Sequence, residues 1–243
     1  MEQYAIQMKG VTKRFGAVTA NDHVNLEIKR GEILSLLGEN GSGKTTLMNM
    51  LAGIYFPDEG EIFVNGQPVT IASPKDAFTC GIGMIHQHFK LVDVFTAAEN
   101  IILGLDNKNR LDLKAASRKI TEICQKYGFH IDPDKKIYDM SVSEKQTVEI
   151  VKVLYRGADI LILDEPTAVL TPQETDRLFN VMRNMKADGK SLIIITHKLH
   201  EVMDVSDRIL VMYEGELVGE LDPKTTTVEE LGLYMAGAKR EGK

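Results

Sequence analysis

The residues best suited to chemistry lie in the segment 38–46, which reads GENGSGKTT and follows an apolar run at 33–37. It matches G-x-x-x-x-G-K-[ST], a pattern whose glycines let successive backbone N–H groups surround a phosphate oxygen. Lys44 would begin a helix, where the positive dipole end disfavours a cation unless an anion is bound. Thr45 offers a hydroxyl for Mg²⁺. The segment predicts a site for a magnesium-bound nucleoside triphosphate; the alternative is a glycine-rich turn with an exposed lysine.

Two carboxylates and a histidine follow other apolar runs. Asp164 and Glu165 come directly after 160–163, and His197 comes after the run LIIIT. Because open α/β sheets bind ligands at the carboxyl ends of their strands, we expect these side chains near the same phosphates. One carboxylate would hold the metal and the other would accept a proton from the attacking water. Turn carboxylates before a proline, and a strand-end histidine, are the alternatives. Gln87, after a strand-like run, could reach Mg²⁺ or that water, although a loop glutamine alone is a weak signal.

The elements that must position these residues alternate between strand and helix. We expect strands at 4–8, 24–28, 33–37, 160–163 and 192–196, a hairpin at 209–221, and helices at 45–52, 113–127, 172–187 and 228–235. This order predicts an α/β fold, namely a phosphate-loop core with a mainly parallel sheet flanked by helices. The early alternating strands predict an N-terminal antiparallel subdomain. The stretch 74–156 reads as mostly helical, so we expect an inserted helical subdomain there, between core segments 1–73 and 157–243 of a single domain, 1–243.

Composition limits the classes of protein to which the chain can belong. It has 243 residues, 43% hydrophobic and 26% charged, with a net charge of −6, a balance typical of a soluble globular domain. No apolar run approaches the ~18 residues of a membrane span, and the N-terminus does not resemble a signal peptide. Net acidity argues against nucleic acid as a partner. We interpret Cys80 and Cys124 as small core thiols.

These motifs, in this order and with MSVSEKQ at 140–146 just before ILILDEP, closely resemble the ATP-binding subunit of an ABC transporter. The resemblance covers essentially the whole chain. It implies that Glu165 and His197 are catalytic, that Thr45, Gln87 and Asp164 hold Mg²⁺, and that Phe15 stacks on adenine unless it is a buried strand-end residue. The other expected ATP contacts are Gly38, Asn40, Gly41, Ser42, Gly43, Lys44, Thr45, Thr46 and Gln87, with Ser141, Ser143 and Glu144 of the signature motif contacting ATP on an opposing domain.

Within that family, IHQHFKLV and YRGADILILDEPTAVLTPQE are most similar to importers of nucleosides and simple sugars. The resemblance implies a peripheral ATPase on the cytoplasmic face of the cell membrane, with ATP and Mg²⁺ as cofactors. The implied partners are two integral membrane permeases, a periplasmic or lipoprotein receptor and a second ABC domain. In that branch one chain usually carries two ATP-binding halves. The present sequence is similar to the N-terminal half.

Two positions depart from the family pattern. Ser143 stands where the signature has its second glycine, and Thr171 replaces an aspartate. A side chain at 143 could crowd the opposing phosphate, and losing one such donor typically costs ~2.7–4 kcal/mol. Ser141 and Glu144 also fit a helix capping box, which does not exclude a phosphate contact. The alternative functions are a soluble ABC ATPase acting on ribosomes or DNA and a phosphate-loop kinase.

Overall fold

A six-stranded sheet lies at the centre of the computed structural model, which describes residues 4–105 and 112–238. The strand order is β10-β9-β3-β8-β7-β6, in which β10 and β9 form an antiparallel hairpin and the other neighbours are parallel. Strands β3 and β8 are buried along their whole length, as parallel strands covered on both faces must be. The strands are β3 Ile33–Leu37, β6 Ile82–Ile85, β7 Ile160–Asp164, β8 Ser191–Ile195, β9 Arg208–Tyr213 and β10 Glu216–Leu221.

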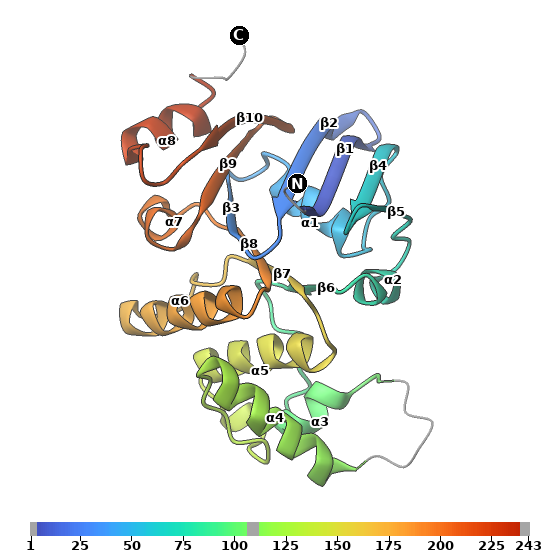
Figure 1. The fold of residues 1–243 in the computed structure, drawn as a ribbon, viewed down its shortest axis with the longest axis vertical. Helices are drawn as coiled ribbons and strands as arrows, with labels where there is room; N and C mark the ends of the chain where they lie inside the picture. Colours follow the sequence, from blue (N-terminus) through green and yellow to red (C-terminus); the bar gives the residue numbers. More distant parts are fainter. Residues whose placement is uncertain (1–3, 106–111, 239–243) are drawn as a thin grey trace.

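A second, four-stranded sheet is antiparallel and has the order β2-β1-β4-β5 (Figure 1). Val24, Leu26 and Ile28 of β2 are buried while the residues between them are exposed, which confirms the expected alternation. The strands predicted at 4–8 and 24–28 are longer than expected, because β1 and β2 continue as a hairpin up to the pair Phe15 and Val18. The strands are β1 Tyr4–Phe15, β2 Val18–Lys29, β4 Glu59–Val64 and β5 Gln67–Val69.

Helix α1 (Lys44–Leu51) packs between the two sheets. Its residues Leu47, Met48 and Leu51 are fully buried, in one cluster with side chains from both sheets. At ~25 cal/mol per Å² of apolar surface, each such side chain contributes about 1.5–3 kcal/mol. The phosphate-loop segment that precedes α1 is therefore attached to a rigid core.

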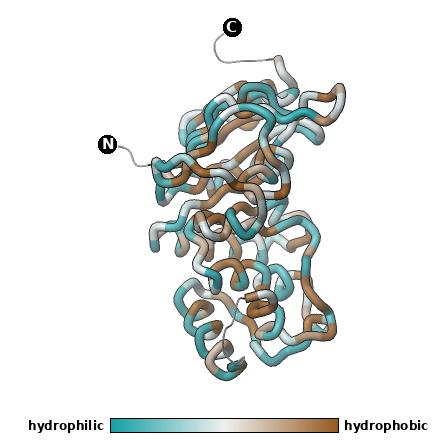
Figure 2. Tube along the Cα trace, turned by 90° about the vertical axis from the view of Figure 1, so that its right-hand side faces the viewer, coloured by the Kyte–Doolittle hydropathy of each residue, from teal (hydrophilic) through white to brown (hydrophobic). Residues whose placement is uncertain are grey.

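The remaining helices cover the rest of the central sheet, and α3, α4 and α5 pack on one another at one end of the molecule (Figure 1). The cluster that joins α3–α6 to the sheet includes Leu161, Leu163 and Leu192. Hydrophobic residues follow the strands in the interior, and hydrophilic ones recur on the outer turns of the helices (Figure 2). The helices are α2 Pro74–Thr79, α3 Ala97–Ile102, α4 Leu113–Tyr127, α5 Val142–Tyr155, α6 Pro172–Ala187, α7 Leu199–Val205 and α8 Val228–Met235, with a 3-10 turn at Ile137–Asp139.

The expected α/β architecture is confirmed, and the segment 74–156 needs one refinement. Strand β6 lies inside that segment but pairs in parallel with β7, so it belongs to the central sheet. The helices that pack together begin only at α3. The division into core and helical parts stays a prediction, and residues 1–3, 106–111 and 239–243 of its ranges lie outside the described residues.

The cysteines differ in their surroundings. Cys124 is buried in the helical cluster, and burial raises the pKa of its thiol to about 11. Cys80 is half-buried beside the other core cluster. Neither forms a disulfide. Within residues 4–105 and 112–238, no helix has both the length and the apolar character to cross a membrane.

Candidate nucleotide-binding site

The loop between β3 and α1 has the backbone that the glycine pattern predicts. Gly43 is the N-cap of α1 with φ at +99°, and no side chain caps that helix end, so its first amides face the loop. A Cβ at Gly43 would lie 2.3 Å from the carbonyl oxygen of Ala20, and one at Gly38 would lie 2.4 Å from that of Met212. The loop thus contacts β2 on one side and β9 on the other, and only glycine fits at these two contacts.

Lys44 is buried within this loop. Its Nζ donates to the carbonyl oxygens of Gly38 and Glu39, both at 2.8 Å, and lies 3.4 Å from the hydroxyl of Ser42. Burial lowers the pKa of Lys44, while the nearby carboxylates of Glu165 and Asp164 oppose that shift. The lysine is therefore a cation held mainly by dipoles of its own loop, and a phosphate group would supply the stronger partner.

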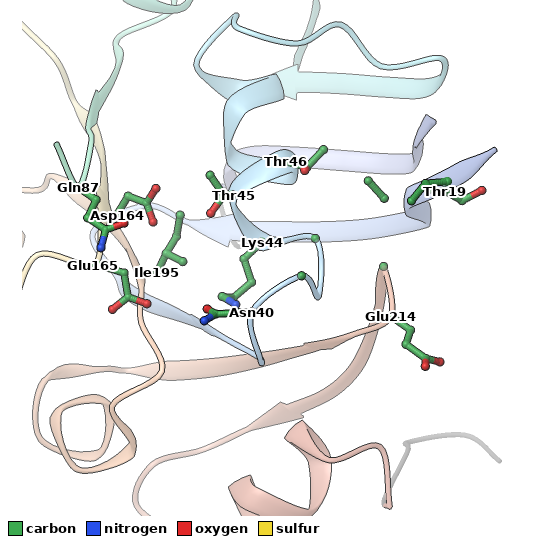
Figure 3. A pocket seen from close by; sticks show the side chains of 15 residues that line it. Thr19, Asn40, Lys44, Thr45, Thr46, Gln87, Asp164, Glu165, Ile195 and Glu214 are labelled. Atoms are coloured by element: carbon green, nitrogen blue, oxygen red, sulfur yellow. The ribbon is translucent and has the colours of Figure 1, made fainter. Parts of the chain in front are cut away.

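An open cavity of about 420 Å³ lies beside the loop. Figure 3 shows Lys44 and Thr45 between Gln87, Asp164 and Glu165 on one side and Thr19 and Glu214 on the other. Of the predicted site residues, the cavity is lined by Asn40, Gly41, Gly43, Lys44, Thr45, Thr46, Gln87, Asp164 and Glu165. Its volume falls in the range of about 300–1,000 Å³ that small-molecule sites usually have.

Several residues of the cavity wall were not predicted. Val18, Thr19 and Ala20 come from the start of β2, and Glu214 and Gly215 come from the turn between β9 and β10. The glycine turn at 214–215 was visible in the sequence as a hairpin signal. Nothing in the sequence placed it beside a phosphate loop more than 160 residues earlier, because that contact depends on β9 pairing with β3.

Asp164 and Glu165 leave β7 on the cavity side of the sheet. Burial raises the pKa of Asp164, the charge of Glu165 adds to the shift, and Lys44 opposes it. The carboxylate of Asp164, the hydroxyl of Thr45 and the amide of Gln87 all line the cavity. These oxygen donors are the kind that Mg²⁺ prefers.

Glu165 is paired with His197. Its Oε1 lies 2.8 Å from His197 Nδ1, and because an ionised carboxylate can only accept, Nδ1 carries the hydrogen. The amide of Glu165 donates to the carbonyl of Ile195 at 2.9 Å, which keeps β7 and β8 paired up to the residues that bear these side chains. Glu165 has φ at +48°, a left-handed conformation that costs a non-glycine residue of order 1–3 kcal/mol. The other carboxylate oxygen, Oε2, is buried and has no hydrogen-bond partner among residues 4–105 and 112–238.

Of the residues expected to contact ATP bound to this chain, four do not line the cavity. They are Phe15, Gly38, Ser42 and His197. Ser42 and Gly38 lie in the loop behind Lys44, and His197 reaches the cavity through Glu165. Phe15 is 43% exposed at the tip of the β1–β2 hairpin, with its ring edge-on to Tyr55 at 5.1 Å between centroids, so it is not a buried strand-end residue. Its pairing partner Val18 lines the cavity, so Phe15 lies next to a residue of the cavity wall.

The signature segment begins helix α5 away from the cavity. Ser141 caps the helix, with its hydroxyl accepting from the Glu144 amide and the Glu144 carboxylate accepting from the Ser141 amide, so the capping box is present. The amide of Thr171, and then the hydroxyls of Thr171 and Ser143, hold the pKa of Glu174 below its usual range. Ser143 and Glu174 line one pocket between α5 and α6, so the Ser143 side chain lies near the start of α6.

The donor set fits a magnesium-bound triphosphate. Within the part of the chain that the structure describes, the hydrogen-bond partners of the buried Lys44 Nζ are loop carbonyls and a hydroxyl, and Glu165 Oε2 is a buried acceptor without a partner. Both features cost stability unless a ligand or water completes them. Among the described residues, no group of three or more His, Cys, Asp and Glu side chains could hold a metal. A Mg²⁺ site here would instead combine Asp164 with neutral oxygens and phosphate.

The central sheet, the loop between β3 and α1, and the cavity beside them define the class of a phosphate-loop nucleotide-binding domain. The profile of the ABC transporter family matches residues 21–168, which include the loop, Gln87, the signature segment and both acids. The chain belongs to the ABC transporter family. His197 and Phe15 lie outside the matched residues.

Solved structures agree with this assignment. The ADP conformation of MJ1267, an ATP-binding cassette of an ABC transporter, is 25% identical with a TM-score of 0.82, over 97% of this chain and 95% of that one. CbiO1 from Clostridium perfringens, part of an ABC transporter complex, is 27% identical with a TM-score of 0.82, over 98% and 96%.

Curated relatives are more similar in sequence. The nucleoside import ATP-binding protein NupA of Lactococcus lactis is 54% identical over 96% of this chain and 46% of its own length. The guanosine import ATP-binding protein NupO of Bacillus subtilis is 52% identical, over 97% and 46%. A ribose import ATP-binding protein, RbsA of Caldanaerobacter subterraneus, is 41% identical, over 96% and 47%. The chain spans about half the length of the curated relatives it matches.

Proposed function

We propose that this chain binds and hydrolyses ATP as the motor subunit of an importer for nucleosides or simple sugars. The observation that carries the proposal is the Glu165–His197 pair at the end of the central sheet, whose glutamate lines the same cavity as Lys44 and Asp164. The carboxylate of Glu165 can accept the proton of a water that attacks a phosphate bound in this cavity. The names of the relatives support the importer branch, with nucleosides ahead of sugars by sequence identity.

Different residues of the cavity would bind the phosphates, hold the metal and activate the water. Lys44 and the amides at the start of α1 would bind the phosphates. Thr46 and Asn40 line the same cavity and would lie beside the bound phosphates. Asp164, Thr45 and Gln87 would hold Mg²⁺, which neutralises charge that develops on the phosphate oxygens. Glu165 would orient the water and take its proton, and His197 would hold Glu165 by its Nδ1 hydrogen while its Nε2 remains available to the terminal phosphate.

The signature segment would serve a second ABC domain. Ser141, Ser143 and Glu144 lie outside the cavity of their own chain, as expected if they contact ATP bound on an opposing domain. Ser141 is exposed at the start of α5, and the Ser143 side chain lies beside Glu174, so the backbone amide at 143 can still face a phosphate. Because the chain spans about half of its relatives, the second domain could be the C-terminal half of one longer chain.

The remaining partners follow from the importer function. Two membrane permeases and a substrate-binding lipoprotein or periplasmic receptor would complete the transporter, with this subunit peripheral on the cytoplasmic face of the membrane. Residues 157–243 and 1–73 would form the ATP-binding core, and the groove near Gln87 would pass the motion of the domain to the permeases. The alternative of a soluble ABC ATPase on ribosomes or DNA is not favoured, since the relatives above are named for import.

Replacing Glu165 by glutamine tests the proposal directly. The E165Q variant keeps the shape of the side chain and loses the base, so ATP hydrolysis should fall by about 10²–10⁴-fold. Affinity for Mg-ATP, measured with a fluorescent nucleotide, should stay within about twofold. Glu122→Gln on the exposed face of α4 is the matched control and should leave both values unchanged. Wild-type chain that does not bind Mg-ATP, or unchanged hydrolysis in E165Q, would contradict the assignment.

Transport specificity needs a cellular test. Cells that carry the complete transporter should take up labelled guanosine, and E165Q in this domain should abolish that uptake. Labelled ribose in the same cells distinguishes the two branches. Uptake of ribose alone would move the assignment to the sugar importers, and uptake of neither would contradict the import function.

A further inference from the structure

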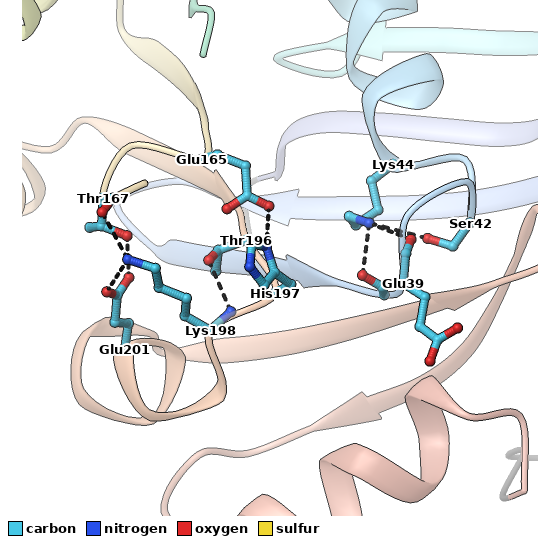
Figure 4. Close-up of polar contacts among 10 residues, drawn as sticks. Glu39, Ser42, Lys44, Glu165, Thr167, Thr196, His197, Lys198 and Glu201 are labelled. Atoms are coloured by element: carbon cyan, nitrogen blue, oxygen red, sulfur yellow. Dashed lines mark hydrogen bonds and ion pairs between the residues drawn. The ribbon is translucent and has the colours of Figure 1, made fainter. Parts of the chain in front are cut away.

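The loops that carry Glu165 and His197 are also joined by a second set of contacts, centred on Lys198. Its Nζ donates to the carbonyl of Thr167 at 2.8 Å and to Glu201 Oε1 at 3.1 Å (Figure 4). The hydroxyl of Thr167 donates to Oε2 of the same glutamate. Lys198, Thr167 and Glu201 therefore form a closed cluster, which we call the Lys198 cluster.

The cluster lies one or two residues from each member of the Glu165–His197 pair. Thr167 is two residues after Glu165, and Lys198 directly follows His197. The backbone amide of Lys198 also donates to the hydroxyl of Thr196 at 3.1 Å, which holds the chain where it leaves β8. The Lys198 side chain thus ties the loop after β8 to the loop after β7 at the level of the two side chains.

The contacts of the Lys198 cluster are partly shielded from water, which strengthens them. Thr167 is 1% exposed, and the side chains of Glu201 and Lys198 are 20% and 34% exposed. A partly buried ammonium with a carbonyl and a carboxylate as partners makes charge-assisted bonds, which are stronger than those between neutral groups. A lysine pointing freely into water would not restrain either loop in this way.

The pair itself needs such a restraint. His197 has a side chain that is 58% exposed, and the hydrogen bond to Glu165 is the side-chain contact found for its ring among the described residues. Glu165 is held at φ +48°, a conformation that persists only when the surrounding structure determines it. The hydrogen bond between them is therefore not enough to hold both side chains in place. The Lys198 cluster restrains the loop after β7 at Thr167 and the loop after β8 at Lys198.

We propose that Lys198 is a positioning residue, which keeps His197 aligned with Glu165 by tying the loop after β8 to the carbonyl of Thr167. The proposal rests on the proposed ATP hydrolysis, but its structural part can be tested separately. It differs from a role in helix stability, in which Lys198 and Glu201 would merely support the first turn of α7. That simpler role predicts a lower melting temperature with no specific effect on His197.

The first test measures turnover. Lys198→Met should lower kcat by tenfold or more, since a displacement of ~1 Å in a catalytic group costs about 10²-fold. Mg-ATP affinity should stay within about twofold, and Lys198→Arg should recover most of the rate. Lys190→Met is the matched control, because Lys190 pairs with Asp159 at the opposite end of β8 and should change neither value. Equal rates for K198M and wild type would overturn the proposal.

A double-mutant cycle shows whether Lys198 acts through His197. If it does, Lys198→Met should change the residual rate of His197→Ala by less than about twofold, because residues that act as one unit are not additive. Fully additive losses would overturn the proposal and leave Lys198 with an independent role.

A spectroscopic test of the proposal does not depend on activity. The side-chain ¹⁵N signals of His197, assigned by their loss in His197→Ala, report its hydrogen bond to Glu165. They should shift in K198M and stay unchanged in K190M. If the wild-type chain has no turnover, the function proposed above fails while this spectrum still decides the role of Lys198; unchanged signals in K198M would overturn it. Should K198M not fold, Glu201→Gln removes the charge that holds Lys198 and supplies the same readouts.

Discussion

The phosphate loop and the Glu165–His197 pair face the same ligand site but are assembled differently. The loop groups of residues 38–46 are neighbours in the chain, and Lys44 bonds to carbonyls five and six residues before it. Glu165 and His197 are 32 residues apart and meet because β7 and β8 pair in parallel. The loop is bounded by a strand and a helix, whereas the pair depends on two loops that must be aligned.

The two parts are therefore sensitive to different kinds of substitution. A contiguous loop keeps its donor groups together even when neighbouring elements shift, but it needs backbone angles that only glycine adopts freely. A pair formed across strands tolerates ordinary residues, yet any change that moves one loop relative to the other separates the two side chains. We therefore expect changes in the pair to lower turnover with little effect on binding, and changes in the loop to lower stability and binding together.

The largest expected effect comes from removing one member of the pair. His197→Ala should lower ATP turnover by about 10²–10³-fold, comparable to the loss of one oriented donor at a reacting centre. Nucleotide affinity should stay within about twofold. His200→Ala, on the exposed face of α7, is the control and should behave as wild type. A loss of affinity as large as the loss of turnover would place His197 among the binding residues instead.

Glycine substitutions in the phosphate loop should have a smaller effect, measured as a loss in the free energy of unfolding. Gly43→Ala puts a Cβ 2.3 Å from the carbonyl of Ala20 and keeps a positive φ, so denaturant unfolding should show a loss of about 2–4 kcal/mol. Gly41→Ala has the same sign of φ but no atom within 4 Å of its Cβ, and should cost about 1–2 kcal/mol. Equal losses would show that the contact with β2 does not constrain the loop.

The smallest effect concerns charge in the cavity. Burial raises the pKa of Asp164 above the ordinary aspartate value of 3.8, so ionisation of this group costs the folded state stability. The cost is absent below pH 3.8, grows as the pH rises from there to the raised pKa, and is complete above the raised pKa. Asp164→Asn removes the charge and should raise the melting temperature of the nucleotide-free chain by about 1–3 °C at neutral pH.

D164N should also lose most of the stabilisation that Mg-ATP gives to the wild-type chain. Mg-ATP should stabilise the wild-type chain against heat and should stabilise D164N much less, because the variant lacks the carboxylate that would hold the metal. Asp176→Asn, an exposed residue of α6, serves as the control for loss of a surface charge. A lower melting temperature for D164N without nucleotide would show that the attraction to Lys44 outweighs burial.

Elements with a strong local pattern were predictable. The strand at 33–37 and the helices at 113–127, 172–187 and 228–235 have the bounds expected from periodicity, caps and flanking glycines. The long β1 and β2 were underestimated, because their outer halves are partly exposed and lack the apolar alternation. Strand β6 was recognised as a short apolar run but not as a member of the central sheet, since its pairing with β7 bridges more than 70 residues.

The binding chemistry of this protein could be inferred from the order of its residues, because glycines, Lys44 and Thr45 act through neighbours and through the start of a helix that immediately follows. Asp164 and Glu165 could also be predicted from the sequence, because they directly follow the apolar run of a buried strand. The partnership of Glu165 with His197, the walls formed by Thr19 and Glu214, and the cluster around Lys198 came only from the folded chain. Each of these contacts joins segments whose proximity is set by sheet pairing and packing, which no local pattern encodes.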